Sequence, residues 1–226
     1  KNESKRDEFL KKNNLRFLRY YQVNAIAAIQ QKIKNGGDRF LLEMATGTGK
    51  TTTSSAIIKM FLRLYKVNRV LFLVDRLELE TQAKKEINDF LQNDFETAIW
   101  KENKDDWRRA NIVISTVQSF IKNNKYKRIF KPNSFDLVIS DEAHRSLGQR
   151  SRNVFEYFIG FKLGLTATPR DFLKSVNTDD MSMTDPKELE RRLMLDTYSI
   201  FGCEDGEPTF RYTLREGIKD EILVNP

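Results

Sequence analysis

The chain has one cysteine, one histidine and no apolar run that approaches the length of a membrane span. A lone Cys203 excludes a disulfide within the chain and suits a reducing cytosol, so we expect a cytoplasmic protein. Because His144 is the single histidine, no Cys/His cluster for zinc can form. The polar N-terminus lacks the apolar core of a secretory signal, and the chain begins at Lys1 rather than Met, so we expect a fragment of a longer protein.

Basic residues outnumber acidic ones, which gives a net charge of +7 and an isoelectric point of about 9.4. Positive residues gather near the N-terminus and in residues 122–131, whereas residues 179–207 are mostly acidic. A basic balance favours a polyanionic partner, but a basic run is more often a solvated surface than a binding site. The charge by itself therefore leaves both interpretations open.

The 226 residues are enough for one large domain or two small ones. We expect a basic lead-in over residues 1–17 and a domain over residues 18–226. Within this domain, residues 171–209 show little periodicity, and we expect a variable acidic excursion there. Residues 210–214 are expected to return as a strand, and residues 210–226 to form the exit from the domain.

Residues 40–51 carry the strongest local signal. A short apolar run leads into a turn with two glycines, then Lys50 and Thr51, and then a segment compatible with a helix. Gly47 and Gly49 let the backbone turn sharply and aim its N–H groups at phosphate oxygens. A turn that only joins a strand to a helix is the alternative, which this order of residues disfavours. The residues expected to bind a nucleotide here are Thr46, Gly47, Thr48, Gly49, Lys50 and Thr51.

Short apolar runs alternate with helix-compatible segments along most of the chain. The runs cover residues 69–74, 112–116, 137–140 and 163–165, and such runs are typical of strands that are buried on both faces. The alternation predicts an α/β fold with a parallel sheet and helices on both of its faces. Ligands of such sheets bind at the carboxyl ends of the strands, and the polar motifs of this chain fall there.

Two acids follow one of these runs directly. Asp141 is placed to hold Mg²⁺ together with the Thr51 hydroxyl, while Glu142 can orient and deprotonate a water that attacks the nucleotide. Lys50 supplies positive charge to the phosphates, so Lys50, Asp141 and Glu142 are the candidate catalytic residues. The alternative is a surface turn, which a phosphate loop in the same sheet disfavours.

Weaker signals flank this centre. Gln22 begins a helical pattern, and its amide can meet both a donor and an acceptor on an adenine edge, although a plain helix start explains it too. His144 is expected to couple the nucleotide site to Thr166 and Thr168, which follow the last apolar run. A solvent-exposed turn is the alternative for His144.

These motifs, in this order, resemble those of a superfamily 2 helicase motor. Gln22 is similar to the glutamine of the Q motif, residues 45–51 to motif I, residues 141–144 to motif II and residues 166–168 to motif III. The resemblance implies the first RecA-like lobe of a two-lobe motor that uses ATP and Mg²⁺.

A narrower resemblance points to the R subunit of type I restriction enzymes. It implies an ATP-driven translocase on double-stranded DNA that works with modification (methyltransferase) and specificity subunits. The nuclease and the second lobe, with its arginine fingers, are expected outside this chain. Met44 departs from the small residue that opens motif I in many members. The stretches that carry the resemblance are residues 18–22, 44–51, 72–76, 164–169, 201–202 and 212–220.

The resemblance also implies where DNA is contacted. Arg76, Thr116 and Gln118 follow strands on the side where such motors touch the phosphate backbone. Contacts of this kind carry no base information and are sensitive to salt. For Arg76, pairing with Asp75 or Glu78 is the structural alternative.

Several other functions fit the same motifs. A stand-alone DNA or RNA helicase would have this lobe. A type III restriction subunit is a close variant of the type I R subunit. A non-catalytic nucleic-acid-binding module is disfavoured by the intact set of Lys50, Thr51, Asp141 and Glu142. A small-molecule kinase would have no evident use for residues 141–144 or 166–168.

Overall fold

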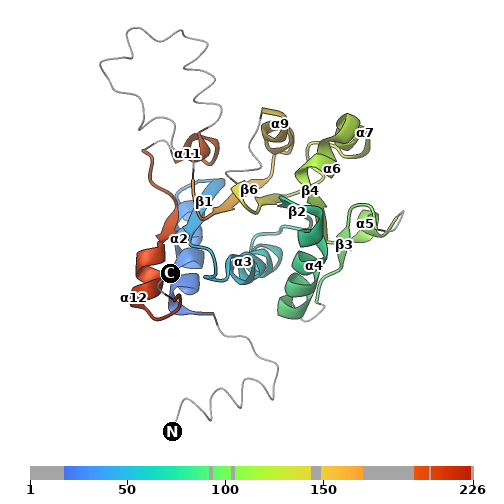
Figure 1. Cartoon of the computed structure of the whole chain (residues 1–226). Coiled ribbons are helices and arrows are strands. Elements are labelled where there is room, and N and C mark those ends of the chain that lie inside the picture. Colours follow the sequence, from blue (N-terminus) through green and yellow to red (C-terminus); the bar gives the residue numbers. More distant parts are fainter. Residues whose placement is uncertain are drawn as a thin grey trace, which may run out of the picture.

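The computed structural model describes residues 18–91, 94–102, 105–143, 149–169, 196–203 and 205–224. Within them, seven parallel strands form one sheet in the order β3-β4-β2-β5-β6-β1-β7, with helices on both faces (Figure 1). The predicted α/β fold with a parallel sheet is confirmed. The strands are β1 (Arg39–Met44), β2 (Val70–Val74), β3 (Thr97–Ile99), β4 (Ile112–Thr116), β5 (Leu137–Ser140), β6 (Phe161–Thr166) and β7 (Phe210–Tyr212).

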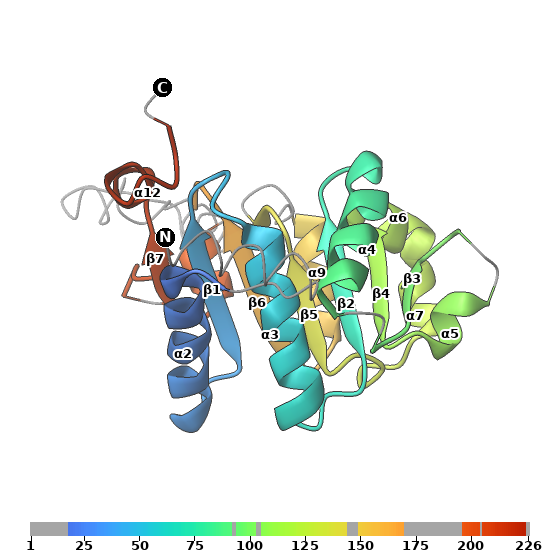
Figure 2. The ribbon, with the colours of Figure 1, turned by 90° about the horizontal axis from the view of Figure 1, so that it is seen from below.

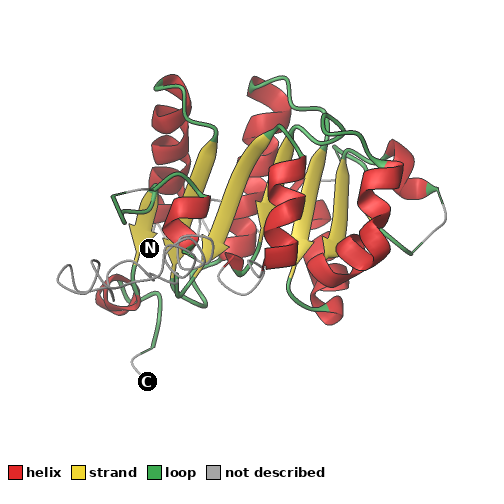
Figure 3. Ribbon diagram, turned by 90° about the horizontal axis from the view of Figure 1, so that it is seen from above, coloured by secondary structure: helices red, strands yellow, loops and turns green. Residues whose placement is uncertain are grey.

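Helices cover the sheet in two layers. One face carries α2 (Tyr20–Lys34), α3 (Lys50–Leu64) and α4 (Leu77–Leu91), which stand in front of the strands in Figure 2. The other face carries α6 (Val117–Ile121), α7 (Lys125–Ile129), α9 (Gln149–Tyr157) and α11 (Thr197–Ile200), and Figure 3 shows the sheet between the two layers. The remaining elements are α5 (Asp106–Arg109), the 3-10 helix η1 (Lys122–Asn124) and α12 (Leu214–Lys219).

The strands are apolar along their whole length because each face of the sheet meets a helical layer. In β2, Val70, Phe72 and Val74 belong to the core on the side of α3 and α4. The alternate residues Leu71 and Leu73 belong to the core on the other side. Successive side chains of a strand point to opposite faces, so a strand without polar residues requires two cores.

The ends of several elements differ from the sequence expectation. The first helix begins at Tyr20 rather than Gln22, so both tyrosines lie within it. The expected strand over residues 210–214 ends at Tyr212, and its extension to Leu214 is wrong. The reason is the Thr213 hydroxyl, which accepts from the Glu216 N–H while the Glu216 carboxylate accepts from the Thr213 N–H, so that α12 begins at Leu214.

Part of the expected acidic excursion lies outside the described residues, and so does all of residues 1–17. Of residues 171–209, the structure describes 196–203 and 205–209. Tyr198 and Phe201 in this stretch are buried in the core on the face of the sheet that carries α9 and α11. The limits of the excursion therefore stay a prediction. Among the described residues, no helix is both long enough and apolar enough to span a membrane.

Lys162 is a buried cation near the start of β6. Its ammonium donates to the carbonyls of Phe158 and Gly160 at 2.6 and 2.5 Å, at the end of α9. Burial, together with the nearby Arg39 guanidinium, lowers the pKa of Lys162 to about 8. A folded-state pKa below the ordinary value of about 10.4 means that the folded chain holds this proton less tightly than the unfolded chain.

We predict that this lysine makes the stability of the chain rise with pH in alkaline solution. Below pH 8 the cost of burying the charged ammonium is present in full. As the pH rises to about 10.4 this cost is relieved, and the free energy of unfolding increases by up to about 3 kcal/mol. Denaturant unfolding of the unchanged chain and of Lys162→Met over this range isolates the effect, because all other groups are shared. Parallel curves for the two proteins would contradict the prediction.

Candidate nucleotide site

The turn between β1 and α3 has the backbone of a phosphate-binding loop. Gly47 and Gly49 have φ angles of 84° and 79°, in the left-handed region that favours glycine. Gly49 is the N-cap of α3, so the N–H groups of the first turn of that helix lie at the end of the loop. A helix start combined with such a loop attracts anions.

The two acids predicted from the sequence lie beside this loop. The Lys50 ammonium is 3.3 Å from the Glu142 carboxylate, and both groups are largely shielded from solvent. Burial, together with the Glu142 charge, raises the pKa of Asp141 to about 6, while Lys50 acts in the opposite direction. The structure thus brings together the three candidate catalytic residues from distant parts of the chain.

Strand pairing fixes the position of these acids. The Asp141 N–H donates to the Leu73 carbonyl at 2.8 Å, which ties the end of β5 to β2. The Glu142 N–H donates to the Asp141 carboxylate at 3.1 Å, and Glu142 has a φ of 51°. A glutamate rarely adopts this conformation, and strain of this kind gathers at functional sites.

Gln22 lies against the loop. Its side-chain oxygen accepts from the Arg19 N–H at 2.9 Å, and its amide nitrogen donates to the carbonyls of Thr48 and Gly49 at 3.4 and 3.3 Å. The side chain is buried, and an added Cβ on Gly49 would come within 2.9 Å of it. Gln22 therefore supports the loop, and its contact with an adenine edge stays a prediction.

The proposed coupling residues are only partly described. Thr166 ends β6, is fully buried, and its hydroxyl accepts from the Thr168 N–H at 3.1 Å. Thr166 pairs in register with Glu43 on β1, close to the start of the phosphate loop. His144 lies outside the described residues. The two threonines are thus next to the site, and their coupling role stays a prediction.

The three residues proposed to contact DNA differ in their exposure and in their contacts within the protein. Arg76 is exposed, and its guanidinium is 3.6 Å from the Asp75 carboxylate, so the pairing considered as an alternative is present. Thr116 is buried, and its hydroxyl caps α6 by accepting from the Ser119 N–H at 3.1 Å. Gln118 is exposed on α6. Binding of DNA by these residues stays a prediction.

Sequence reasoning assigned no role at the site to three residues that touch the loop, Tyr21, Tyr212 and Leu223. The Tyr21 hydroxyl donates to the Thr48 carbonyl at 2.8 Å, and the Ala45 N–H donates to the Tyr212 carbonyl at 3.0 Å. Tyr21 stands directly before Gln22, which is a sequence signal, but Tyr212 reaches the loop only through the pairing of β7 with β1. No local sequence pattern predicts such a contact.

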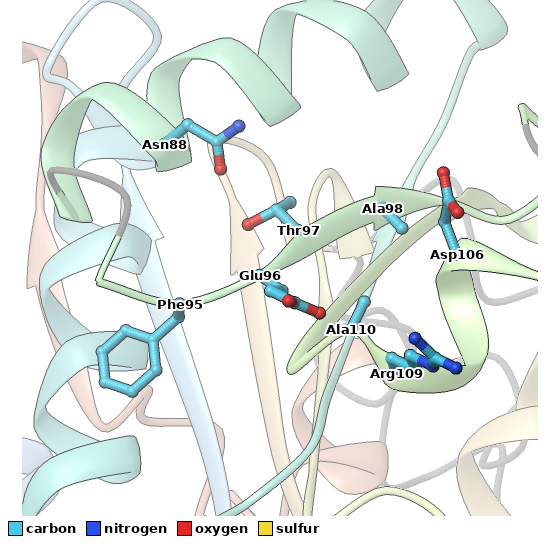
Figure 4. A pocket seen from close by; sticks show the side chains of 8 residues that line it. All are labelled: Asn88, Phe95, Glu96, Thr97, Ala98, Asp106, Arg109 and Ala110. Carbon is cyan, nitrogen blue, oxygen red and sulfur yellow. The ribbon is translucent and has the colours of Figure 1, made fainter.

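Two cavities differ in their relation to the loop. A cavity of about 310 Å³ lies at the ends of β1, β6 and β7, and Thr46, Thr168 and Tyr212 line it. A second cavity of about 470 Å³ lies at β3, with Asn88, Thr97 and Arg109 in its wall (Figure 4). β3 and β7 are the opposite edges of the sheet, so the second cavity is remote from the phosphate loop.

Comparison with known proteins agrees with this geometry. A family model described as the res subunit of type III restriction enzymes matches residues 16–171, more than half of the chain. The chain belongs to this family. As a member of the res-subunit family it has a helicase-like ATPase fold, and the matched residues contain the phosphate loop and both acids.

Relatives of this res-subunit family member include type I restriction enzymes. The EcoAI endonuclease subunit of Escherichia coli is 35% identical over 214 residues, which are 91% of this chain and 23% of the relative. A fragment of an HsdR subunit of a type I restriction enzyme from Vibrio vulnificus has a TM-score of 0.57 at 30% identity, covering 89% of this chain and 31% of that one. The chain therefore spans only about a quarter of the EcoAI subunit.

A more distant structure shows the fold alone. A nuclease-deletion mutant of the type ISP enzyme LlaGI, solved with a DNA substrate mimic, has a TM-score of 0.62 at 24% identity. It covers 92% of this chain, and this chain aligns with 21% of it. The sheet and helices described here thus have the same fold as the matched part of that enzyme.

We predict that Glu142 is held in its strained backbone conformation for function and not for stability. Glu142→Asn should be more stable than Glu142→Ala by about 1 kcal/mol, because asparagine tolerates a positive φ and both variants lack the charge. Denaturant unfolding of the two variants measures the difference. Equal stabilities would show that the positive φ carries no strain.

Proposed function

We propose that this chain is the ATP-binding motor lobe of an ATP-dependent DNA translocase, the R subunit of a type I restriction enzyme. The observation that carries the proposal is the meeting of Lys50, Glu142 and the half-buried Asp141 beside the phosphate loop. These groups sit at the carboxyl ends of β1 and β5, where ligands of parallel sheets bind. Similarity to the EcoAI subunit supports the choice of a restriction motor.

The residues fit ATP and Mg²⁺ by their chemistry. The N–H groups of the loop and the Lys50 ammonium suit the phosphates, since both are hydrogen-bond donors and the ammonium adds a positive charge. Mg²⁺ binds oxygen ligands, and several of these come from water and from the phosphates. The protein therefore needs to supply only one carboxylate and one hydroxyl. Asp141 and Thr51 would supply them, and the ion would neutralise charge on the phosphates.

Each remaining residue has a proposed task in hydrolysis. Glu142 orients the attacking water and takes its proton, and the ion pair with Lys50 keeps its carboxylate next to the loop. Lys50 neutralises negative charge that develops on the transferred phosphoryl group. Thr166 and Thr168 pass the state of the site to the rest of the motor, together with His144.

Other partners are proposed on weaker grounds. Double-stranded DNA is expected to run past Arg76, Gln118 and Thr116, bound through its phosphates. Modification and specificity subunits would complete the enzyme, as the R-subunit resemblance implies, and the complex would act in the cytoplasm. A type III subunit or a stand-alone helicase remains the alternative assignment for the parent protein.

A first test compares this chain with the longer parent protein. The chain alone is expected to bind ATP weakly and to hydrolyse it very slowly, because a second lobe completes the site in such motors. The parent should show DNA-stimulated hydrolysis, and Glu142→Gln in the parent should reduce the rate at least a hundred-fold while ATP still binds. Brisk DNA-stimulated turnover by the chain alone would refute the two-lobe assignment.

A second test separates the restriction enzyme from a stand-alone helicase. The parent protein is purified from its own cells, and the proteins that accompany it are identified by mass spectrometry. We expect a DNA methyltransferase and a specificity subunit in fixed proportion to the parent. A parent that purifies alone, or together with repair or RNA-processing factors, would favour the helicase.

A further inference from the structure

Four residues to which the sequence assigned no role at the site lie around the phosphate loop. We name Tyr21, Tyr212, Asp220 and Leu223 the loop clamp. Tyr21 comes from α2, Tyr212 from β7, and the other two from the end of α12 and the turn that follows it. Figure 2 shows α12 at the same end of the sheet as the β1–α3 loop.

The clamp touches the loop backbone at three points. The Tyr21 hydroxyl donates to the Thr48 carbonyl at 2.8 Å, and the Ala45 N–H donates to the Tyr212 carbonyl at 3.0 Å. Leu223 covers Gly47 so closely that an added Cβ there would come within 3.0 Å of a Leu223 methyl group. These contacts are spread from the first residues of the loop to its middle.

The clamp residues also bind one another. The rings of Tyr21 and Tyr212 are stacked, with centroids 4.0 Å apart and planes 8° from parallel, and both side chains are buried. The Tyr212 hydroxyl donates to the Asp220 carboxylate at 2.6 Å. The Tyr20 hydroxyl donates to the same carboxylate, which ties α2 to the end of α12.

Leu223 is held in place by α12. Its N–H donates to the Gly217 carbonyl at 3.0 Å, and an added Cβ on Gly217 would come within 2.7 Å of a Leu223 methyl group. The absence of a side chain at Gly217 thus lets Leu223 lie between α12 and the phosphate loop. A change at Gly217 must move Leu223 relative to Gly47.

A loop with two glycines needs outside support to hold one shape. Glycine loses more conformational freedom on ordering than any other residue, and a ligand that must order its own site binds more weakly. Gly47 and Gly49 give this loop its turn and also make it easy to deform. Contacts that fix Thr48, Ala45 and Gly47 before the ligand arrives therefore strengthen binding.

We propose that the loop clamp is a positioning unit that holds the phosphate loop ready for the triphosphate of ATP. The inference rests on the proposed function, since it assumes that the loop binds ATP. It assigns a role in nucleotide affinity to residues after β7, which lie beyond the stretch matched by the family model. None of the four residues is proposed to touch the reacting atoms.

The test compares two tyrosines that make the same kind of bond. Tyr21→Phe removes the hydroxyl that donates to the Thr48 carbonyl and accepts from the Arg19 guanidinium at 3.2 Å. Tyr157→Phe, on α9, removes a hydroxyl that donates to the Phe130 carbonyl at 2.6 Å. Loss of one such bond changes an equilibrium about two- to ten-fold. We expect Tyr21→Phe to weaken ATP binding by this factor and Tyr157→Phe to leave it unchanged. Calorimetric titration of the whole chain with ATP and Mg²⁺ measures both affinities, and unfolding experiments measure how much stability each variant loses.

A double-mutant cycle provides a second measurement if Tyr21→Phe does not fold. Leu223→Ala and Gly217→Ala should each weaken ATP binding, the first by removing the contact with Gly47 and the second by displacing Leu223. Because both act through one side chain, Gly217→Ala should have no further effect once Leu223 is alanine. Independent effects of the two substitutions would overturn the role of Leu223.

The outcomes separate the two proposals. If the unchanged chain binds no ATP, the proposed function fails and the clamp fails with it. If the unchanged chain binds ATP and Tyr21→Phe binds it as tightly as Tyr157→Phe, the clamp alone is refuted. Weaker binding by Tyr21→Phe at a stability equal to that of Tyr157→Phe supports the clamp, because a purely structural role would affect both variants alike.

Discussion

The ion pair between Lys50 and Glu142 is the contact on which the rest of the site depends. It joins the end of the phosphate loop to the end of β5, next to the half-buried Asp141. Charges are costly to shield from water unless they are paired or bind an ion. Two acids and a lysine at the edge of a sheet are therefore hard to explain by stability. The proposed binding of a polyanionic ligand together with a cation would account for them.

The sheet makes this meeting possible. Because every strand is parallel, all carboxyl ends lie at one edge, and residues from β1, β5 and β6 reach the same place. The two helical layers bury both faces of the strands and leave the polar groups to the loops beyond the strand ends. The C-terminal strand β7 then closes the sheet next to β1 and brings α12 to the phosphate loop. The proposed nucleotide site at this edge is thus in contact with elements from early and late in the described part of the chain.

Membership of the res-subunit family agrees with the fold but does not explain every residue proposed at the surface. Arg76 lies beside Asp75, and the hydroxyl of Thr116 is used as a helix cap, so the expected DNA contacts have structural uses of their own. A side chain can serve both purposes, as an exposed ion pair contributes little to stability and is easily exchanged for a phosphate. Burial separates the three residues, since Gln118 and Arg76 face solvent and Thr116 does not.

The sequence alone determined the parallel sheet, the phosphate loop and the two acids. Each rests on a local signal, because apolar runs predict buried strands, paired glycines allow a tight turn, and Asp141 follows its strand directly. Only the tertiary structure decided what holds the loop. The contact of Tyr212 with Ala45 arises from strand pairing, and that of Leu223 with Gly47 from the placement of α12. Such contacts join residues far apart in the chain, and no local spacing distinguishes the buried Tyr212 or the half-buried Leu223 from other apolar residues.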